Sequence, residues 1–207
     1  MKRLLWCFLI ASSPVWAQPA AQEDALSALV GTVYTVAHRE TSEGLLEACG
    51  LEFNVIGRDH ATRGGAAVQG IGSYYLRRSG NAVMYALKLG VRDTLGSEGR
   101  AVSPYYAFAR PVRGSGPRER ALRAESETPG YALFVGAVDD EAIAVLKAIL
   151  EQRRIVVGFN RKAGQQDVSL EIDLAVKAAR LEGDRLIRDR SSAMVDDFGA
   201  CINDLAK

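Results

Sequence analysis

One short stretch of the chain combines the residue types that acid–base chemistry uses, because Arg58, Asp59 and His60 follow directly on one another. A carboxylate that orients an imidazole would make His60 a general base or a metal ligand, with Arg58 beside it for an anionic group. The three residues stand at the end of an expected strand, where neighbours point to opposite faces. Asp59 and His60 therefore meet only if the backbone turns there. The alternative, which we favour, is a polar turn in which Asp59 bonds a nearby backbone group.

The two histidines of the chain, His38 and His60, would supply half of a zinc site, with Asp59 or Glu40 as a carboxylate ligand. No HxH, HExxH or CxxC spacing supports such a site. We therefore expect no metal and no cofactor.

Two glycine-containing stretches fall short of catalytic motifs. Residues 70–74 read GIGSY, which is not the G-x-S-x-G of a hydrolase nucleophile, because glycine stands where serine belongs. Residues 114–118 read GSGPR and lack the spacing and the lysine of a phosphate-binding loop. Gly70 and Gly72 are instead expected to mark a bulge or a close approach of backbones.

The segment 92–130 is rich in glycine, proline and arginine, and we expect it to be flexible apart from a short edge strand at 104–109. Guanidinium groups match carboxylates and phosphates, so its arginines are candidate binding residues. These are Arg110, Arg113, Arg118, Arg120 and Arg123. The alternative is a solvated loop that keeps the surface soluble. Alternation also sends one member of each pair Tyr74–Tyr75 and Tyr105–Tyr106 outward, which would suit a binding face. The alternative, which we favour, is that these aromatic side chains pack in the core.

Two of the three cysteines, Cys49 and Cys201, remain if the N-terminal segment containing Cys7 is removed. In an oxidising compartment they have one intramolecular pairing, and we predict that disulfide. The alternative is two free cysteines that act as small buried hydrophobes.

The elements around these cysteines support the pairing. Cys49 alternates with Leu51, Phe53 and Val55 on one face of an expected strand. Cys201 lies on the apolar stripe of an expected helix at 192–206, capped by Ser191 or Ser192. Both cysteines are therefore predicted to face a core. The stripe residues, at spacings of four, three and four, are Met194, Phe198, Cys201 and Leu205.

The remaining patterns predict a mainly β or α+β domain, an antiparallel sandwich or curved sheet with two helices packed on it. Besides the helix at 192–206, a helix at 140–152 is indicated by an Asp139 cap and an apolar set at Ile143, Leu146, Ile149 and Leu150. Alternation and turn residues indicate strands elsewhere. They are expected at 30–38, 49–55, 68–77, 83–91, 104–109, 131–135, 155–160 and 168–177.

The N-terminus predicts export. Lys2 and Arg3 precede a short apolar run at 4–10, and small residues end at Ala17, which is the pattern of a cleaved signal peptide over residues 1–17. Retention as an anchor is the weaker reading, because the run is too short to span a bilayer. Residues 18–207 would then form a single exported domain, periplasmic or secreted. It would carry 24 basic and 25 acidic residues, a formal charge of −1.

That near-neutral charge gives no general attraction to nucleic acid, and we expect no stable membrane insertion. We expect a non-enzymatic binding or structural domain of the cell envelope that binds an envelope protein or another envelope component through the segment 105–123. The alternative from another class is a hydrolase-like enzyme that uses Asp59 and His60.

Overall fold

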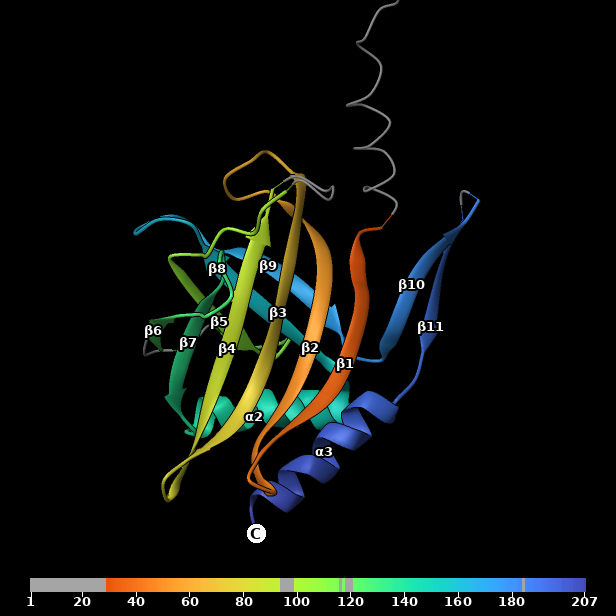
Figure 1. Ribbon diagram of the computed structural model, residues 1–207. Coiled ribbons are helices and arrows are strands. Elements are labelled where there is room, and N and C mark those ends of the chain that lie inside the picture. Colours follow the sequence, from red (N-terminus) through yellow and green to blue (C-terminus); the bar gives the residue numbers. More distant parts are fainter. Residues whose placement is uncertain (1–28, 94–98, 116, 118–120, 184) are drawn as a thin grey trace, which may run out of the picture.

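The computed structural model describes residues 29–93, 99–115, 117, 121–183 and 185–207. Within this part of the chain, eleven strands form three sheets in which every pairing is antiparallel, and two α-helices pack against them (Figure 1). This β-rich α+β architecture confirms the fold class expected from the sequence. The predicted signal peptide over residues 1–17 lies outside the described residues.

The largest sheet has six strands in the order β1-β2-β3-β4-β7-β6 and curves around the core. Its members are β1 (Gly31–Ser42), β2 (Leu45–Asp59), β3 (Ala66–Ser79), β4 (Ala82–Arg92), β7 (Ala132–Ala137) and β6 (Leu122–Glu125). The alternation predicted for β2 holds, because Cys49, Leu51, Phe53 and Val55 are all 0–1% exposed. One face of the sheet therefore supplies one wall of the core, and the other face is turned outward.

A second sheet closes the core from behind. It contains β5 (Tyr106–Arg110), β8 (Arg154–Asn160) and β9 (Val168–Asp173), in the order β5-β8-β9. The side chain of Leu170 on β9 packs against two glycines of the large sheet, Gly57 and Gly70. A Cβ added at Gly57 would lie 2.4 Å from the Leu170 Cδ2, and a Cβ added at Gly70 would lie 2.6 Å from its Cδ1. The register of β3 is continuous here, so Gly70 marks a close approach and not a bulge.

The predicted helix at 140–152 is present as α2 (Asp140–Lys147), which continues as a π-helical turn, η1 (Ala148–Gln152). Asp139 caps it by accepting a hydrogen bond from the backbone N–H of Ala142 at 2.8 Å. The predicted apolar face was partly wrong, because Ile143 and Leu150 are 40% and 41% exposed. The buried face instead runs through small and β-branched side chains, which let the helix lie close to the sheets. Its fully buried members are Ala142, Val145, Ala148 and Ile149.

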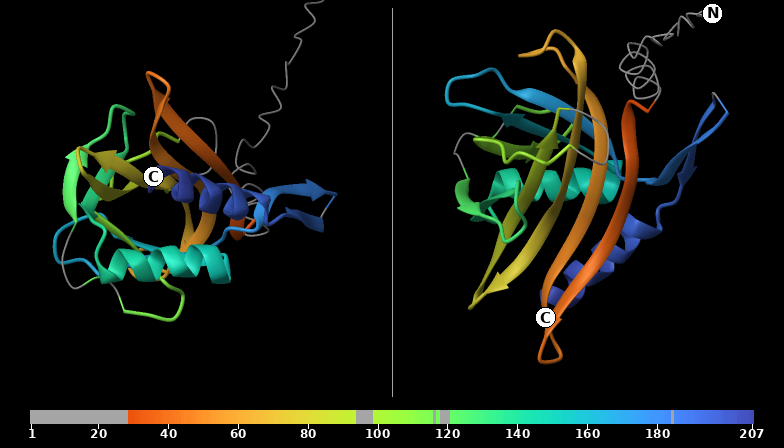
Figure 2. Two further views of the ribbon diagram at one scale, coloured as in Figure 1. Left: turned by 90° about the horizontal axis from the view of Figure 1, so that it is seen from below. Right: turned by 45° about the horizontal axis from the view of Figure 1, so that its top comes forward.

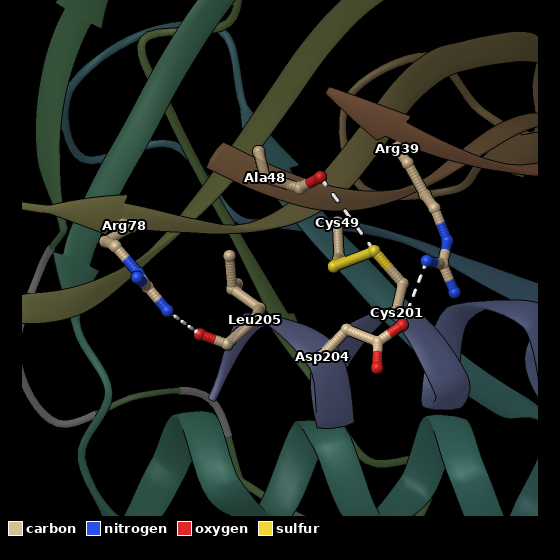
Figure 3. The surroundings of a disulfide bond; sticks show 7 residues. All are labelled: Arg39, Ala48, Cys49, Arg78, Cys201, Asp204 and Leu205. Atoms are coloured by element: carbon tan, nitrogen blue, oxygen red, sulfur yellow. Dashed lines mark hydrogen bonds and ion pairs between the residues drawn. A yellow bond between two sulfur atoms is a disulfide. The ribbon is translucent and has the colours of Figure 1, made fainter. Parts of the chain in front are cut away.

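The C-terminal helix is α3 (Ala193–Leu205), and its predicted stripe is buried. Figure 3 shows Cys201 of α3 joined to Cys49 of β2 by the disulfide expected from the sequence. An Arg39–Asp204 ion pair at 3.0 Å lies beside it. Of the two serines predicted to cap α3, Ser192 makes no capping bond, and its hydroxyl donates to the Asp196 carboxylate. The Oγ of Ser191 accepts a hydrogen bond from the backbone N–H of Ala193, the first residue of α3, at 3.1 Å.

The predicted strand at 168–177 is two strands. β9 ends at Asp173, whose carboxylate accepts from the N–H of Ala175 at 3.1 Å, and this local bond turns the chain. Beyond the turn, β10 (Val176–Glu182) pairs with β11 (Arg185–Arg190) in a hairpin that projects beyond β1 (Figures 1 and 2).

The segment 92–130 holds more structure than the sequence suggested. The edge strand expected at 104–109 corresponds to β5, but β6 was missed. Residues 94–98, 116 and 118–120 of this segment lie outside the described residues, and with them Arg118 and Arg120.

Candidate functional site

The carboxylate of Asp59, at the end of β2, is buried and hydrogen-bonded to neighbouring residues. It is 0% exposed and accepts hydrogen bonds from the N–H of Thr62 at 2.8 Å and from the Thr62 hydroxyl at 2.6 Å. The guanidinium of Arg161, which follows β8, donates to the same carboxylate at 2.7 Å. Asp59 therefore closes the β2–β3 turn and ties it to the second sheet.

Arg161 links Asp59 to a second carboxylate. It also pairs with Asp93, which follows β4 and pairs in turn with Arg63 at 3.1 Å. Burial opposes ionisation of Asp59, but the bonds from Thr62 and Arg161 outweigh it and lower the pKa of Asp59 below its usual range. The cluster thus consists of ionised, mutually bonded groups, an arrangement that rigidifies a turn.

Neither histidine is bonded to this cluster in the described part of the chain. His60 is exposed, and its ring lies against Gly65 across the turn. His38 of β1 pairs in register with Gly50 of β2, and its ring meets Tyr75 edge-on at a centroid distance of 4.9 Å. Gly50 is nine residues before Asp59 on β2, which is about 30 Å of strand. The structure therefore does not bring His38 and His60 together.

Two of the candidate arginines bond the protein's own backbone. Arg110 donates to the carbonyls of Pro111, Val112 and Gly114, each at 3.1 Å. Arg123 donates to the Pro104 carbonyl at 3.3 Å, which fixes β6 to the preceding segment. Arg113 is exposed.

Beside Arg113 the segment forms one wall of a hollow of about 610 Å³, which we call the α2 hollow. Its opposite wall is the acidic start of α2, with Asp139, Asp140 and Glu141. In the sequence, the acidic residues at the start of α2 indicated only a helix N-terminus. Their position across the hollow from Arg113 was not predicted.

A second concavity, of about 590 Å³, lies on the outward face of the large sheet, and we call it the outer trough. In Figure 1 this face is turned to the viewer, with α2 and the second sheet behind it. The floor of the trough is apolar, formed by Ala48, Tyr75, Met84, Ala86, Leu133 and Val135. The rim is polar or charged and includes Glu40, Arg77, Lys88, Glu125 and Glu127.

The rim cations of the outer trough already have partners. Arg77 pairs with Glu47 at 3.0 Å, and Lys88 donates to the Thr128 hydroxyl at 2.8 Å. Glu125 and Glu127 are exposed, and no ion pair to either is found within the described part of the chain. The rim is therefore left acidic.

No helix among the described residues is long and apolar enough to cross a membrane. Over the same residues, no group of three or more histidine, cysteine or acidic side chains is placed to hold a metal ion. The chain matches no protein-family model, no curated protein and no solved structure.

Proposed function

We propose that this protein is an exported, non-enzymatic binding domain of the cell envelope that contacts a partner protein through the outer trough. The observation that carries the proposal is the combination of an apolar floor and a charged rim on a sheet face that no described element covers. Protein interfaces have this anatomy, with an apolar centre and a polar margin. The acidic rim favours a partner that places lysine or arginine there.

Export rests on the signal peptide predicted over residues 1–17 and fits the disulfide between Cys49 and Cys201, since such bonds persist in oxidising compartments. A periplasmic or secreted location follows from the same two features.

Site-specific photo-crosslinking in intact cells tests the proposal. A photoreactive amino acid replaces Ala86 on the trough floor in one variant and Lys162, exposed in the β8–β9 turn, in the control. We expect one defined protein adduct from position 86 and none from position 162. Charge reversal at Glu125 and Glu127 should weaken the adduct. Adduct formation that is equal at both positions, or unchanged by the reversal, contradicts the proposal.

A hydrolase-like activity at Asp59 and His60 is the competing function. His60→Ala tests it, because loss of the protein's cellular role with an intact fold would favour the enzyme. The bonds from Thr62 and Arg161 to Asp59 favour a structural role for that carboxylate.

A further inference from the structure

Two buried amide oxygens in the connection between β8 and β9 have no hydrogen-bond donor among the residues that the structure describes. They are Oδ1 of Asn160, the last residue of β8, and Oε1 of Gln165 in the turn that follows. Asn160 is 4% exposed, and its backbone carbonyl already accepts from the N–H of Tyr105 at 2.9 Å. Buried polar groups are nearly always bonded, because an unbonded one has lost its contacts with water and gained none. These two oxygens therefore indicate an electropositive partner that is not part of the described chain.

The connection is a tight turn that places both amides near one carboxylate. It runs from Asn160 to Asp167, and the N–H of Gln165 donates to the carbonyl of Lys162 at 3.3 Å within it. Nδ2 of Asn160 donates to Oδ1 of Asp167 at 2.8 Å. Because Oδ1 and Nδ2 of Asn160 are bonded to the same carbon, the unbonded oxygen lies within about 5 Å of that carboxylate oxygen. Gln165 stands two residues before Asp167.

The charge of Asp167 favours a cation over a neutral donor. Asp167 is exposed, and no ion pair to it is found within the described part of the chain. The neighbouring guanidinium of Arg161 is paired with Asp59 and Asp93, and Lys162 is exposed to solvent. One carboxylate without a partner in the described chain therefore lies beside two acceptor oxygens, and all three attract a cation.

The types of oxygen in this turn suit calcium. Ca²⁺ is bound in proteins by carboxylate, amide and backbone carbonyl oxygens, with water completing a flexible coordination sphere. Mg²⁺ demands a regular octahedron and keeps more of its waters, and transition metals prefer imidazole or thiolate ligands. The expectation of no metal rested on the spacing of histidines and cysteines, so it did not address a site built from amides and one carboxylate.

We infer that the β8–β9 connection binds one calcium ion. Oδ1 of Asn160, Oε1 of Gln165 and the carboxylate of Asp167 supply the side-chain ligands, and water completes the coordination sphere. The ion would stabilise the turn that also positions Arg161 against Asp59. None of these residues lines the outer trough, so the site goes beyond the proposed protein-binding function.

Calorimetric titration of the mature protein with CaCl₂, after metal removal with EDTA, tests the inference. We expect one calcium ion per chain with a dissociation constant of about 0.1–1 mM, the range of extracellular calcium modules, and at least about 10-fold weaker binding of Mg²⁺. Calcium should also raise the melting temperature, since the site exists only in the folded chain. Asp167→Asn, which removes the charge and keeps one oxygen, should weaken binding about 10-fold or more.

Gln165→Ala and Gln166→Ala form a matched pair that locates the ion. Both side chains belong to the same turn, but Gln166 is exposed and its amide is not among the buried unbonded groups. Gln165→Ala removes one ligand and should weaken calcium binding about 3- to 10-fold. Gln166→Ala should bind calcium like the wild type.

Asn160→Asp distinguishes a cation from a trapped water. The substitution replaces the Asn160–Asp167 hydrogen bond with two facing carboxylates, and a cation relieves their repulsion whereas water does not. We expect this variant to melt below the wild type without calcium and to bind calcium at least about 10-fold more tightly. The inference is wrong if the wild type binds no calcium at about 10 mM, a concentration above the expected range. It is also wrong if Gln166→Ala weakens binding as much as Gln165→Ala, or if Asn160→Asp gains no affinity.

Discussion

Asp59 stands where the sequence suggests catalysis, yet its carboxylate is fully bonded to Thr62 and Arg161. The turn and the local bond were foreseeable, since aspartate commonly bonds the backbone two or three residues on. The bond from Arg161 could not be foreseen, because Arg161 is 102 residues away in sequence and reaches Asp59 only through the packing of two sheets. That the buried hydroxyl of Tyr74 has no hydrogen-bond partner among the described residues could not be predicted either, since alternation shows that a side chain is buried but not what it meets.

Asp59→Asn should lower the free energy of unfolding by about 1–3 kcal/mol, because the substitution removes a charged acceptor from buried bonds. Urea denaturation measures this change. Asp93→Asn is the matched control. Its carboxylate is 45% exposed, and exposed ion pairs contribute about 1 kcal/mol or less. Equal losses of unfolding free energy at the two positions would contradict this, because they would show that the burial of Asp59 does not strengthen its bonds.

Stability should also depend on pH through Asp59. Because its pKa is lowered in the folded state, its contribution is present above the unfolded value of about 3.9 and is lost as the pH falls through the lower folded value. Thermal unfolding between pH 6 and pH 2 should therefore show a smaller acid loss in Asp59→Asn than in the wild type. Parallel curves for the two proteins would contradict this.

At the scale of elements, the strands with clean alternation were predictable, as were the Asp139 cap of α2 and the buried stripe of α3 that ends at Leu205. The short strand β6 and the corner that separates β9 from β10 were not predictable. β6 carries a short, exposed sequence, LRAE, that has no alternating apolar pattern, and its place is set by pairing with β7. The corner after Asp173 interrupts an unbroken apolar alternation, and Thr32 and Thr35 of β1 hold it in addition to the local bond from Ala175 to Asp173.

The two sheets should be coupled through Gly70 and Leu170. Gly70→Ala places a methyl 2.6 Å from the Leu170 side chain and should cost about 1–3 kcal/mol of stability. In a Leu170→Ala background the same substitution should cost much less, since the clash is gone. A double-mutant cycle measures this coupling. Additive effects would mean that the side chain of Leu170 is not seated over Gly70.

At the scale of the whole molecule, the disulfide connects residues 152 positions apart and fixes α3 to β2 (Figure 3). The pairing was predictable because each cysteine lies on an apolar pattern that faces inward. What the sequence could not predict is that no described element covers the outward face of the large sheet, because that depends on where every other element packs.

Removing the disulfide with Cys49→Ala and Cys201→Ala together should cost up to about 5 kcal/mol in the chain-entropy model. Amide exchange should accelerate first in α3, which the bond joins to the sheet. Arg39→Ala is the control, since it removes the neighbouring ion pair, whose side chains are 47% and 44% exposed, and should cost about 1 kcal/mol or less. If the variant with both cysteines replaced is as stable as Arg39→Ala, the disulfide contributes little to stability.

The affinity of the crosslinked partner for two matched variants tests the binding account most directly. Met84→Glu places a charge on the apolar floor of the outer trough, and Leu181→Glu places the same charge on the β10–β11 hairpin, at a side chain 40% exposed. We expect Met84→Glu to weaken binding at least 10-fold with an unchanged melting temperature, and Leu181→Glu to bind like the wild type. Equal affinities for the two variants would contradict the assignment of the outer trough as the partner-binding face.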